Sequence, residues 1–313
     1  MKPWLSVIIP VHNGQKFLSA TLASAVVEKP EGVEFRIYDS GDDDGAARRA
    51  ADPFFAHMNI VWQDVPNLKP WTAKTNKGVS EAGAAHIVML HQDDLWLPGH
   101  LNAVRRAITR WPEVAISVAS SRFVAADGRV LSPWRLPFTP GLHRGASVAT
   151  ALLVQNSIAI PSPVIRRDAW LACGGMDEAL WYTADWDLYL KLTQLSDIVV
   201  REGATTGFRL HGASLTMTGS RDAAAYYDQL NRVLEKHVDN IPNIPRKIEY
   251  LARASITVNC ALAAAASGDI SRLGAGFFAI AKLGPLGAIR YVHQSRIIDR
   301  LWPRLRLSIG GAF

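Results

Sequence analysis

The sequence predicts an α/β protein with a mixed, mainly parallel central sheet flanked by helices, followed by an all-helical C-terminal region. Strand-like and helix-like segments alternate over the first hundred residues, the pattern of parallel βαβ units. After about residue 220 the chain becomes Ala-rich with long helical periodicity. The length of 313 residues accommodates one large α/β domain and a smaller appendage.

The expected elements follow in order along the first half of the chain. Short apolar runs predict strands at 6–10, 34–38, 59–62, 86–90 and 114–119. Helices are expected at 17–26, 46–55 and 98–110, the last with Pro98 as its start signal. From residue 120 to 140 the pattern is irregular, and Asp127-Gly128 between apolar residues predicts a hairpin turn. The second half of the domain is therefore expected to be mixed rather than strictly parallel.

The helical region is expected to begin after residue 218. This divides the chain into an α/β domain at 1–218, with halves of about 1–110 and 111–218, and a C-terminal region at 219–313. Helical periodicity there covers 227–234, 248–266 and 273–283. The most apolar piece, 256–266, is too short to cross a bilayer, so we expect no transmembrane helix.

Composition narrows the setting and the partners. The two cysteines lie far apart and the first residues lack an export signal, so we expect a reducing, cytoplasmic environment. The net charge of +6 is spread thinly, without a basic run interleaved with stacking aromatics, which argues against nucleic acid. One terminal basic cluster alternates with apolar residues and suits an anionic membrane surface; packing on the α/β domain or in a dimer is the alternative. The cluster comprises Arg290, Arg296, Arg300, Arg304 and Arg306.

Aspartates gather where the predicted strands end. The second strand ends in Asp39-Ser-Gly-Asp-Asp-Asp-Gly45 and the fourth in His91-Gln-Asp-Asp94. In an open α/β sheet, ligands bind beyond the carboxyl ends of the strands, so these acids are expected in one crevice. Crowded carboxylates raise one another's pKa unless a cation is present, and Mg²⁺ or Mn²⁺ prefers such oxygens together with substrate phosphates. A solvated acidic turn or helix cap is the alternative for an isolated Asp-Asp pair.

Taken together, the motifs resemble the family 2 glycosyltransferases, which have the GT-A fold. The resemblance covers residues 4–214, and its specificity comes from the order and spacing of several motifs. They are Ser6-Val-Ile-Ile-Pro-Val-His-Asn-Gly14, Asp39-Ser-Gly-Asp-Asp-Asp-Gly45, Thr75-Asn-Lys-Gly-Val79, Leu90-His-Gln-Asp-Asp-Leu-Trp-Leu-Pro98, Gly174-Gly-Met-Asp-Glu178 and Thr183-Ala-Asp-Trp-Asp-Leu-Tyr-Leu190.

The resemblance implies roles for individual residues. It makes 1–110 the nucleotide-binding half and 111–218 the acceptor-binding half, with a divalent Mn²⁺ or Mg²⁺ as cofactor. Asp185 matches the catalytic base, Asp93 matches the metal ligand of the Asp-x-Asp-type motif, and His211 resembles a late histidine that reaches the metal or diphosphate. Donor-binding candidates are Pro10, Val11, His12, Asn13, Asp39, Asn76, Gln92 and Asp93.

The chemistry asks for the same roles. Displacing a nucleoside diphosphate from an anomeric carbon needs a cation on the leaving group and a carboxylate base on the opposite face of the sugar. Asp187 is the rival base, but positions i and i+2 of a helix point apart, and a helix-start carboxylate is its alternative role. Trp181 and Trp186 flank the base and suit either sugar stacking or packing. Further candidates are Asp94, Arg209, Lys74 and Trp134.

The implied function is inverting transfer of a single sugar from a UDP, GDP or dTDP sugar to a glycan or lipid-linked acceptor. The expected setting is cell-envelope polysaccharide or glycolipid assembly, in the cytoplasm or on the inner face of the membrane. Processive synthesis is not expected, since no Gln-x-x-Arg-Trp string occurs.

Three positions depart from the family pattern: His91, Ser40 and Ala184 stand where acids are usual. A protein that binds a nucleotide sugar or glycan without turnover therefore remains an alternative. A pyrophosphorylase or dinucleotide-dependent oxidoreductase is a second one, although the Gly-x-Gly-x-x-Gly fingerprint is missing after the first strand.

Overall fold

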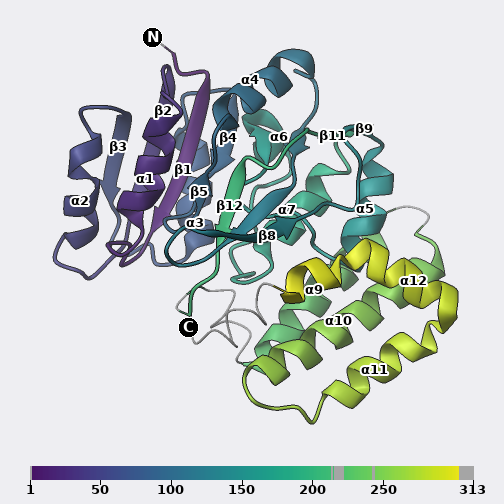
Figure 1. Ribbon diagram of the computed structural model, residues 1–313. Coiled ribbons are helices and arrows are strands. Elements are labelled where there is room, and N and C mark those ends of the chain that lie inside the picture. Colours follow the sequence, from purple (N-terminus) through teal and green to yellow (C-terminus); the bar gives the residue numbers. More distant parts are fainter. Residues whose placement is uncertain (1, 213, 215–221, 242–243, 303–313) are drawn as a thin grey trace.

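A computed structural model describes residues 2–212, 214, 222–241 and 244–302. Its centre is an eight-stranded sheet of order β3-β2-β1-β4-β10-β6-β11-β9, with helices on both faces (Figure 1). Only β10 and β9 run antiparallel to the other six strands. The prediction of a mixed, mainly parallel sheet is thus confirmed.

The strands of this sheet are β1 (Leu5–Val11), β2 (Val33–Asp39), β3 (Asn59–Asp64), β4 (His86–Met89), β6 (Ile116–Val118), β9 (Gly141–His143), β10 (Val164–Arg166) and β11 (Ile198–Val200). A second sheet of order β5-β12-β7-β8 contains β5 (Leu95–Trp96), β7 (Ser121–Val124), β8 (Val130–Trp134) and β12 (Thr206–Arg209). Strands β7 and β8 form an antiparallel hairpin around Asp127-Gly128, as predicted.

The helices before the C-terminal region are α1 (Leu18–Val27), α2 (Ala46–Ala51), α3 (Trp71–Glu81), α4 (His100–Arg110), α5 (Gly145–Val154), α6 (Arg167–Ala172) and α7 (Ala184–Leu192). Two boundaries differ from the prediction by more than one residue. Helix α2 gives way to a 3₁₀ turn at Asp52–Phe54, where Pro53 has no N–H to donate. Helix α4 begins at His100 rather than Pro98, because Gly99 takes a left-handed conformation with φ of 87°.

Helix α3 is an element that the sequence did not predict. Its residues lack an apolar stripe, and among its buried side chains are the polar Thr72, Lys74 and Thr75. The helix nevertheless packs on β1 and β2, where Gly78 lies so close to Ile8 that an added Cβ would fall 2.5 Å from that side chain. Helix α3 therefore carries polar groups into the interior at the sheet edge.

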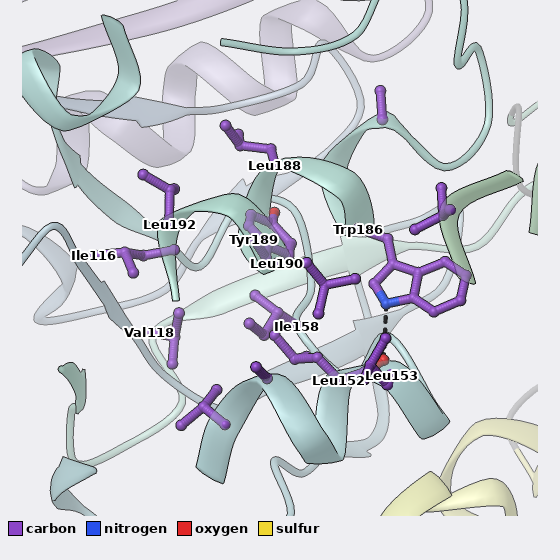
Figure 2. Close-up of a cluster of buried hydrophobic side chains, with 14 of the residues drawn as sticks. Ile116, Val118, Leu152, Leu153, Ile158, Trp186, Leu188, Tyr189, Leu190 and Leu192 are labelled. Atoms are coloured by element: carbon purple, nitrogen blue, oxygen red, sulfur yellow. Dashed lines mark hydrogen bonds between the residues drawn. The ribbon is translucent and has the colours of Figure 1, made fainter. Parts of the chain in front are cut away.

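The two faces of β1 lie in two different cores. Leu5, Val7 and Ile9 pack with α1 and α4 on one face, whereas Ile8 packs with α3 on the other. This alternation is the period-2 signal of a strand buried on both sides. The second core continues through α5 and α7, where Trp186 donates its indole N–H to the Leu152 carbonyl at 2.8 Å (Figure 2).

The C-terminal region consists of α9 (Ala223–Asn240), α10 (Arg246–Ala266), α11 (Leu273–Lys282) and α12 (Gly284–Ser295). Its buried residues, such as Val233 and Leu251, belong to the same hydrophobic core as α5 and α7. The helical region therefore packs on the α/β domain through α9, α10 and α12, with α11 outermost (Figure 1). The predicted boundary at residue 218 falls outside the described residues, and so do Arg304 and Arg306.

Among the described residues, no single helix has both the length and the apolar character needed to cross a membrane. Helices α11 and α12 meet these criteria only as a pair, and they are bent by 115° at the break between them.

Candidate active site

The loops after β1, β4 and β12 meet the start of α7 around a pocket of about 500 Å³. Eleven residues singled out from the sequence line it: Pro10, His12, Lys74, Gln92, Asp93, Asp94, Trp134, Trp181, Asp185, Trp186 and His211. They come from both halves of the α/β domain, and helices α9 and α10 contribute further walls. The expected crevice at the carboxyl ends of the strands is therefore present.

Gln92 joins the ends of β1 and β4. Its Oε1 accepts the His12 backbone N–H at 2.8 Å, and its Nε2 donates to the His12 carbonyl at 3.1 Å. The Gln92 carbonyl in turn accepts the Thr21 hydroxyl of α1 at 2.8 Å. This pairing fixes Pro10 and His12 at the rim of the pocket.

Lys74 of α3 links the ends of β1 and β2 by hydrogen bonds. It is 1% exposed, and its Nζ donates to the Val11 carbonyl at 2.5 Å and to the Ser40 hydroxyl at 2.8 Å. Burial lowers the pKa of Lys74 to about 8, although neighbouring Asp39 opposes that shift. Burial also raises the pKa of Asp39, against the Gly41 N–H that Oδ1 accepts at 2.8 Å. Ser40, one of the departures from the family pattern, is thus the hydrogen-bond acceptor for a buried ammonium.

Asp93 and His211 are in direct contact in the pocket lining. His211 Nε2 lies 2.8 Å from Asp93 Oδ2, and the imidazole packs on the Phe17 ring with centroids 4.5 Å apart. Over the described part of the chain, no group of three or more His, Cys, Asp or Glu side chains is arranged for a metal ion. Two donors suit an Mg²⁺ or Mn²⁺ ion that takes its other ligands from a diphosphate and water, as Mg²⁺ commonly does.

Asp94 and Arg209 lie behind this pair and support it. Asp94 is 2% exposed, and its Oδ1 accepts the Arg209 backbone N–H at 3.0 Å. Burial and the adjacent Asp93 raise the pKa of Asp94 well above its usual range. The Arg209 guanidinium donates to the carbonyls of Asp93 and Ala126 at 2.6 and 2.7 Å. Arg209 therefore does not line the pocket but fixes the loop that carries Asp93.

Asp185 occupies the first turn of α7 and points into the pocket. Its Oδ2 accepts from Asn156 Nδ2 at 3.0 Å, and its Oδ1 accepts the Trp186 backbone N–H at 2.8 Å. Burial raises the pKa of Asp185 to about 6 against these two hydrogen bonds. A carboxylate with this pKa is ionised at neutral pH and is a stronger base than a solvated aspartate.

Asp187 lies on the other side of the same helix. It is fully buried, and its oxygens contact Lys191 at 2.9 Å, Lys236 at 2.9 Å and His237 at 2.8 Å. Burial alone would raise the pKa of Asp187, but the hydrogen bonds from His237 and Lys191 hold it well below the usual range. Asp187 therefore joins α7 to α9 and faces away from the pocket.

Several predicted donor-binding residues do not line the pocket with their side chains. Val11 is buried in β1, Asn13 accepts the Asp42 N–H at 2.9 Å, and Asp39 lies below the rim. Asn76 Nδ2 donates to the Met176 carbonyl at 2.9 Å, and its Oδ1 accepts the Met176 N–H at 2.9 Å. The geometry of Asn76 supports a role in holding this turn rather than in contacting a donor.

The two glycines of this turn have a backbone role. Gly174 and Gly175 adopt φ of 79° and 66°, and an added Cβ on Gly175 would lie 2.7 Å from Asn76 Oδ1. Of the two tryptophans beside the base, Trp181 is partly exposed to the pocket, whereas Trp186 is 4% exposed and packed in the core.

Some pocket residues escaped the sequence reasoning. Asn156, the partner of Asp185, is a lone asparagine 29 positions earlier and carries no motif. Asn259 of α10 and Arg300 also line the pocket, from a region assigned no part in the site. His91, which the sequence marked as a departure from the family pattern, also lines the pocket; burial lowers the pKa of this residue to about 4, so its imidazole is neutral at pH 7.

Comparison with known proteins places this geometry in a family. The family model described as glycosyl transferase family 2 matches residues 6–159. An uncharacterized glycosyltransferase of Rickettsia prowazekii is 21% identical over 246 residues, which span 75% of this chain and 72% of that protein.

Solved structures of TarS from S. aureus have a similar fold. One aligns with 82% of this chain and 43% of its own length, at 14% identity and a TM-score of 0.59. A fragment covering TarS residues 1–349, in complex with UDP-GlcNAc, aligns over 86% of this chain and 89% of its own, at 13% identity and a TM-score of 0.58. The sheet order, the pocket at the strand ends and these matches agree: the chain belongs to the family 2 glycosyltransferases and has the GT-A fold.

Proposed function

We propose that the protein transfers a single sugar from a nucleotide-sugar donor to an acceptor hydroxyl, with inversion at the anomeric carbon and assistance from a divalent metal. The observation that supports this best is the shared pocket, which contains the Asp93–His211 pair and the carboxylate of Asp185. The pair suits the diphosphate, and the carboxylate suits the attacking hydroxyl.

Asp93 and His211 would hold an Mn²⁺ or Mg²⁺ ion, which would neutralise charge on the leaving nucleoside diphosphate. Asp93 and His211 share the pocket lining with His12 and Gln92, which follow strands β1 and β4. Ligands of open α/β sheets bind at such strand ends, so this location suits a diphosphate. Arg209 keeps Asp93 in position by donating to the Asp93 carbonyl rather than to its carboxylate. The nucleotide would then lie over Pro10 and His12.

Asp185 is the proposed base. Its Oδ2 takes the proton of the acceptor hydroxyl as the oxygen attacks the anomeric carbon, and the nucleoside diphosphate leaves from the opposite face. Asn156 holds the carboxylate by donating to the same oxygen, and the Trp186 N–H holds the other one. A base on one face and a leaving group on the other gives inversion.

A UDP sugar is the first donor to try, because the TarS fragment has been solved in complexes with UDP and UDP-GlcNAc. GDP and dTDP sugars are the alternatives. A hexose is the expected sugar, and Trp181 at the partly exposed wall next to Asp185 offers an aromatic face for it.

Apolar side chains in the pocket lining suit a glycan or lipid-linked acceptor. They include Ile158 and Ile160 of the α/β domain and Leu230 and Ile256 of the helical region. Asn259 adds one amide to this lining. An acceptor of this kind fits cell-envelope polysaccharide or glycolipid assembly, with the protein at the cytoplasmic face of the membrane.

Binding without turnover is the alternative function, and His91 favours it. This histidine stands where the family pattern has an acid, is neutral at pH 7, and has a buried Nε2 without a hydrogen-bond partner. The other two departures carry less weight. Ala184 is fully buried at the start of α7, and the Ser40 hydroxyl accepts a hydrogen bond from Lys74.

Titration calorimetry with UDP, GDP and dTDP, each with and without Mn²⁺, tests the donor site. We expect one nucleotide to bind in a metal-dependent manner to the wild type, and Asp93→Ala to lose the metal dependence. Asp52→Ala, at an exposed ion pair with Arg48, is the control and should bind normally. If none of the three nucleotides binds, the proposal is wrong. If one binds but UDP-sugar hydrolysis stays undetectable with Mn²⁺, the alternative function is favoured.

A further inference from the structure

Large apolar side chains are exposed on α11, on α12 and just before α11. Ile270 is 70% exposed, Phe277 76%, Leu286 85% and Ile289 68%, with Leu273 and Phe278 also exposed. We call these six residues the α11–α12 surface. Soluble proteins rarely expose such a concentration of large side chains unless the surface binds a partner.

The spacing of these residues places them on helix faces rather than at random. Leu273 and Phe277 are four positions apart on α11, and Leu286 and Ile289 are three apart on α12. Other sides of the two helices face the protein: Gly276 packs toward Ala261 of α10, and Tyr291 is fully buried. Each helix thus has one inner face and one outer apolar face.

The charges within the segment that carries this surface are all positive, although Asp269 directly precedes it. Residues 270–298 contain no Asp or Glu, whereas Arg272, Lys282 and Arg290 are exposed among the apolar side chains. Lys282 Nζ lies 4.5 Å from the centroid of the Phe278 ring. With Arg296, this segment carries four of the positive charges in a chain whose net charge is only +6.

Exposed apolar side chains together with positive charge favour a bilayer over a second copy of the chain as the partner of this surface. A second copy of the chain would bring two acid-free, positively charged surfaces together, and like charges disfavour that contact. The interface of an anionic bilayer offers both an apolar layer for the phenylalanine and leucine side chains and negative headgroups for the cations. We propose that the α11–α12 surface docks on an anionic lipid bilayer, with the apolar side chains inserted between headgroups.

Docking there has a consequence for the acceptor, which rests on the proposed function. Helix α11 packs on α10, and α10 contributes Ile256 and Asn259 to the pocket wall. Arg300, soon after α12, lines the same pocket. A bilayer at the α11–α12 surface therefore lies next to the helices that wall the pocket, where a lipid-linked acceptor would enter from the membrane.

Vesicle flotation with the full chain tests the docking surface without requiring turnover. We expect binding to phosphatidylcholine vesicles containing 30% phosphatidylglycerol, weakened by added NaCl, and little binding to pure phosphatidylcholine. Phe277→Ser/Leu286→Ser should bind at least about tenfold more weakly. Val27→Ser/Leu195→Ser, at apolar residues exposed elsewhere, is the matched control and should bind like the wild type.

The cations are tested separately. Arg272→Gln/Lys282→Gln/Arg290→Gln should bind anionic vesicles about 100-fold more weakly at low salt, at about 1 kcal/mol per charge. Lys2→Gln/Lys29→Gln/Arg106→Gln removes three exposed cations elsewhere and is the control. Equal loss in both triple variants would overturn the proposal, because nonspecific net charge would then explain the binding.

Two further results would contradict docking. One is absence of wild-type binding to the anionic vesicles. The other is a dimer in sedimentation velocity that Phe277→Ser/Leu286→Ser dissociates, since the surface would then join two copies of the chain. Nucleotide titration of the same variants separates this proposal from the proposed function: we expect unchanged nucleotide affinity in all of them.

Discussion

Helix α7 carries two aspartates two positions apart, and these two side chains lie in different surroundings. On the pocket side, Asp185 has one amide and one backbone N–H as partners, and burial raises its pKa to about 6. On the side facing α9, Asp187 contacts Lys191, Lys236 and His237, and its pKa lies well below the usual range. On this helix, the carboxylate without a cationic partner is kept reactive, whereas the carboxylate among cations is structural.

Replacing the base should have the largest effect. We expect Asp185→Asn to lower sugar transfer by about 10² to 10⁴-fold, because general-base catalysis contributes that much. Nucleotide affinity should be unchanged, since the Asn side chain keeps the shape and Asp93 and His211 are untouched. Product formation by chromatography and nucleotide titration on the same preparation check both parts. A variant that retains more than a tenth of the wild-type rate would remove Asp185 from the role of base.

Breaking the cluster on the other side should act on stability instead. We expect Asp187→Ala to lower the free energy of unfolding by about 3–5 kcal/mol, because it removes the buried carboxylate that Lys191, Lys236 and His237 share. The matched control is Asp228→Ala, which removes an exposed ion pair with Arg232 of 2.7 Å and should cost about 1 kcal/mol or less. Urea denaturation measures both. Similar small losses in the two variants would mean that Asp187 does not hold α7 to α9.

Lys74 is a buried cation for which burial outweighs favourable partners. It lies among oxygen acceptors, yet its pKa is lowered to about 8. Its ordinary value is 10.5, so between pH 8 and 10.5 the unfolded chain holds a proton that the folded protein has released. Stability therefore rises with pH in that window and is independent of this group below it. We expect the free energy of unfolding of the wild type, relative to Lys74→Met, to rise by up to about 3 kcal/mol from pH 8 to 10.5. A flat difference would contradict the lowered pKa.

Much of the fold could be predicted, because period-2 apolar runs and long helical repeats are local signals. The strands at β1 to β4, the Asp127-Gly128 hairpin and the C-terminal helices followed from such patterns. Helix α3 was missed because its buried positions are polar, and polar burial is decided by partners such as the Val11 carbonyl, which are distant in sequence.

The candidate site divides in the same way. Asp93, Asp185 and His211 could be named from motifs, and the structure places all three in one pocket. The cluster around Asp187 could not be foreseen, since His237 lies 50 residues away on a helix with no motif. Asn156 and Asn259 likewise reach the pocket through tertiary packing alone.

The pH dependence of sugar transfer tests directly whether Asp185 is the base. Its pKa of about 6 predicts that turnover, measured with donor and Mn²⁺ kept saturating at each pH, falls about tenfold per pH unit below 6. Turnover that persists to pH 4 under these conditions would contradict this role of Asp185 and assign the acid limb to another group.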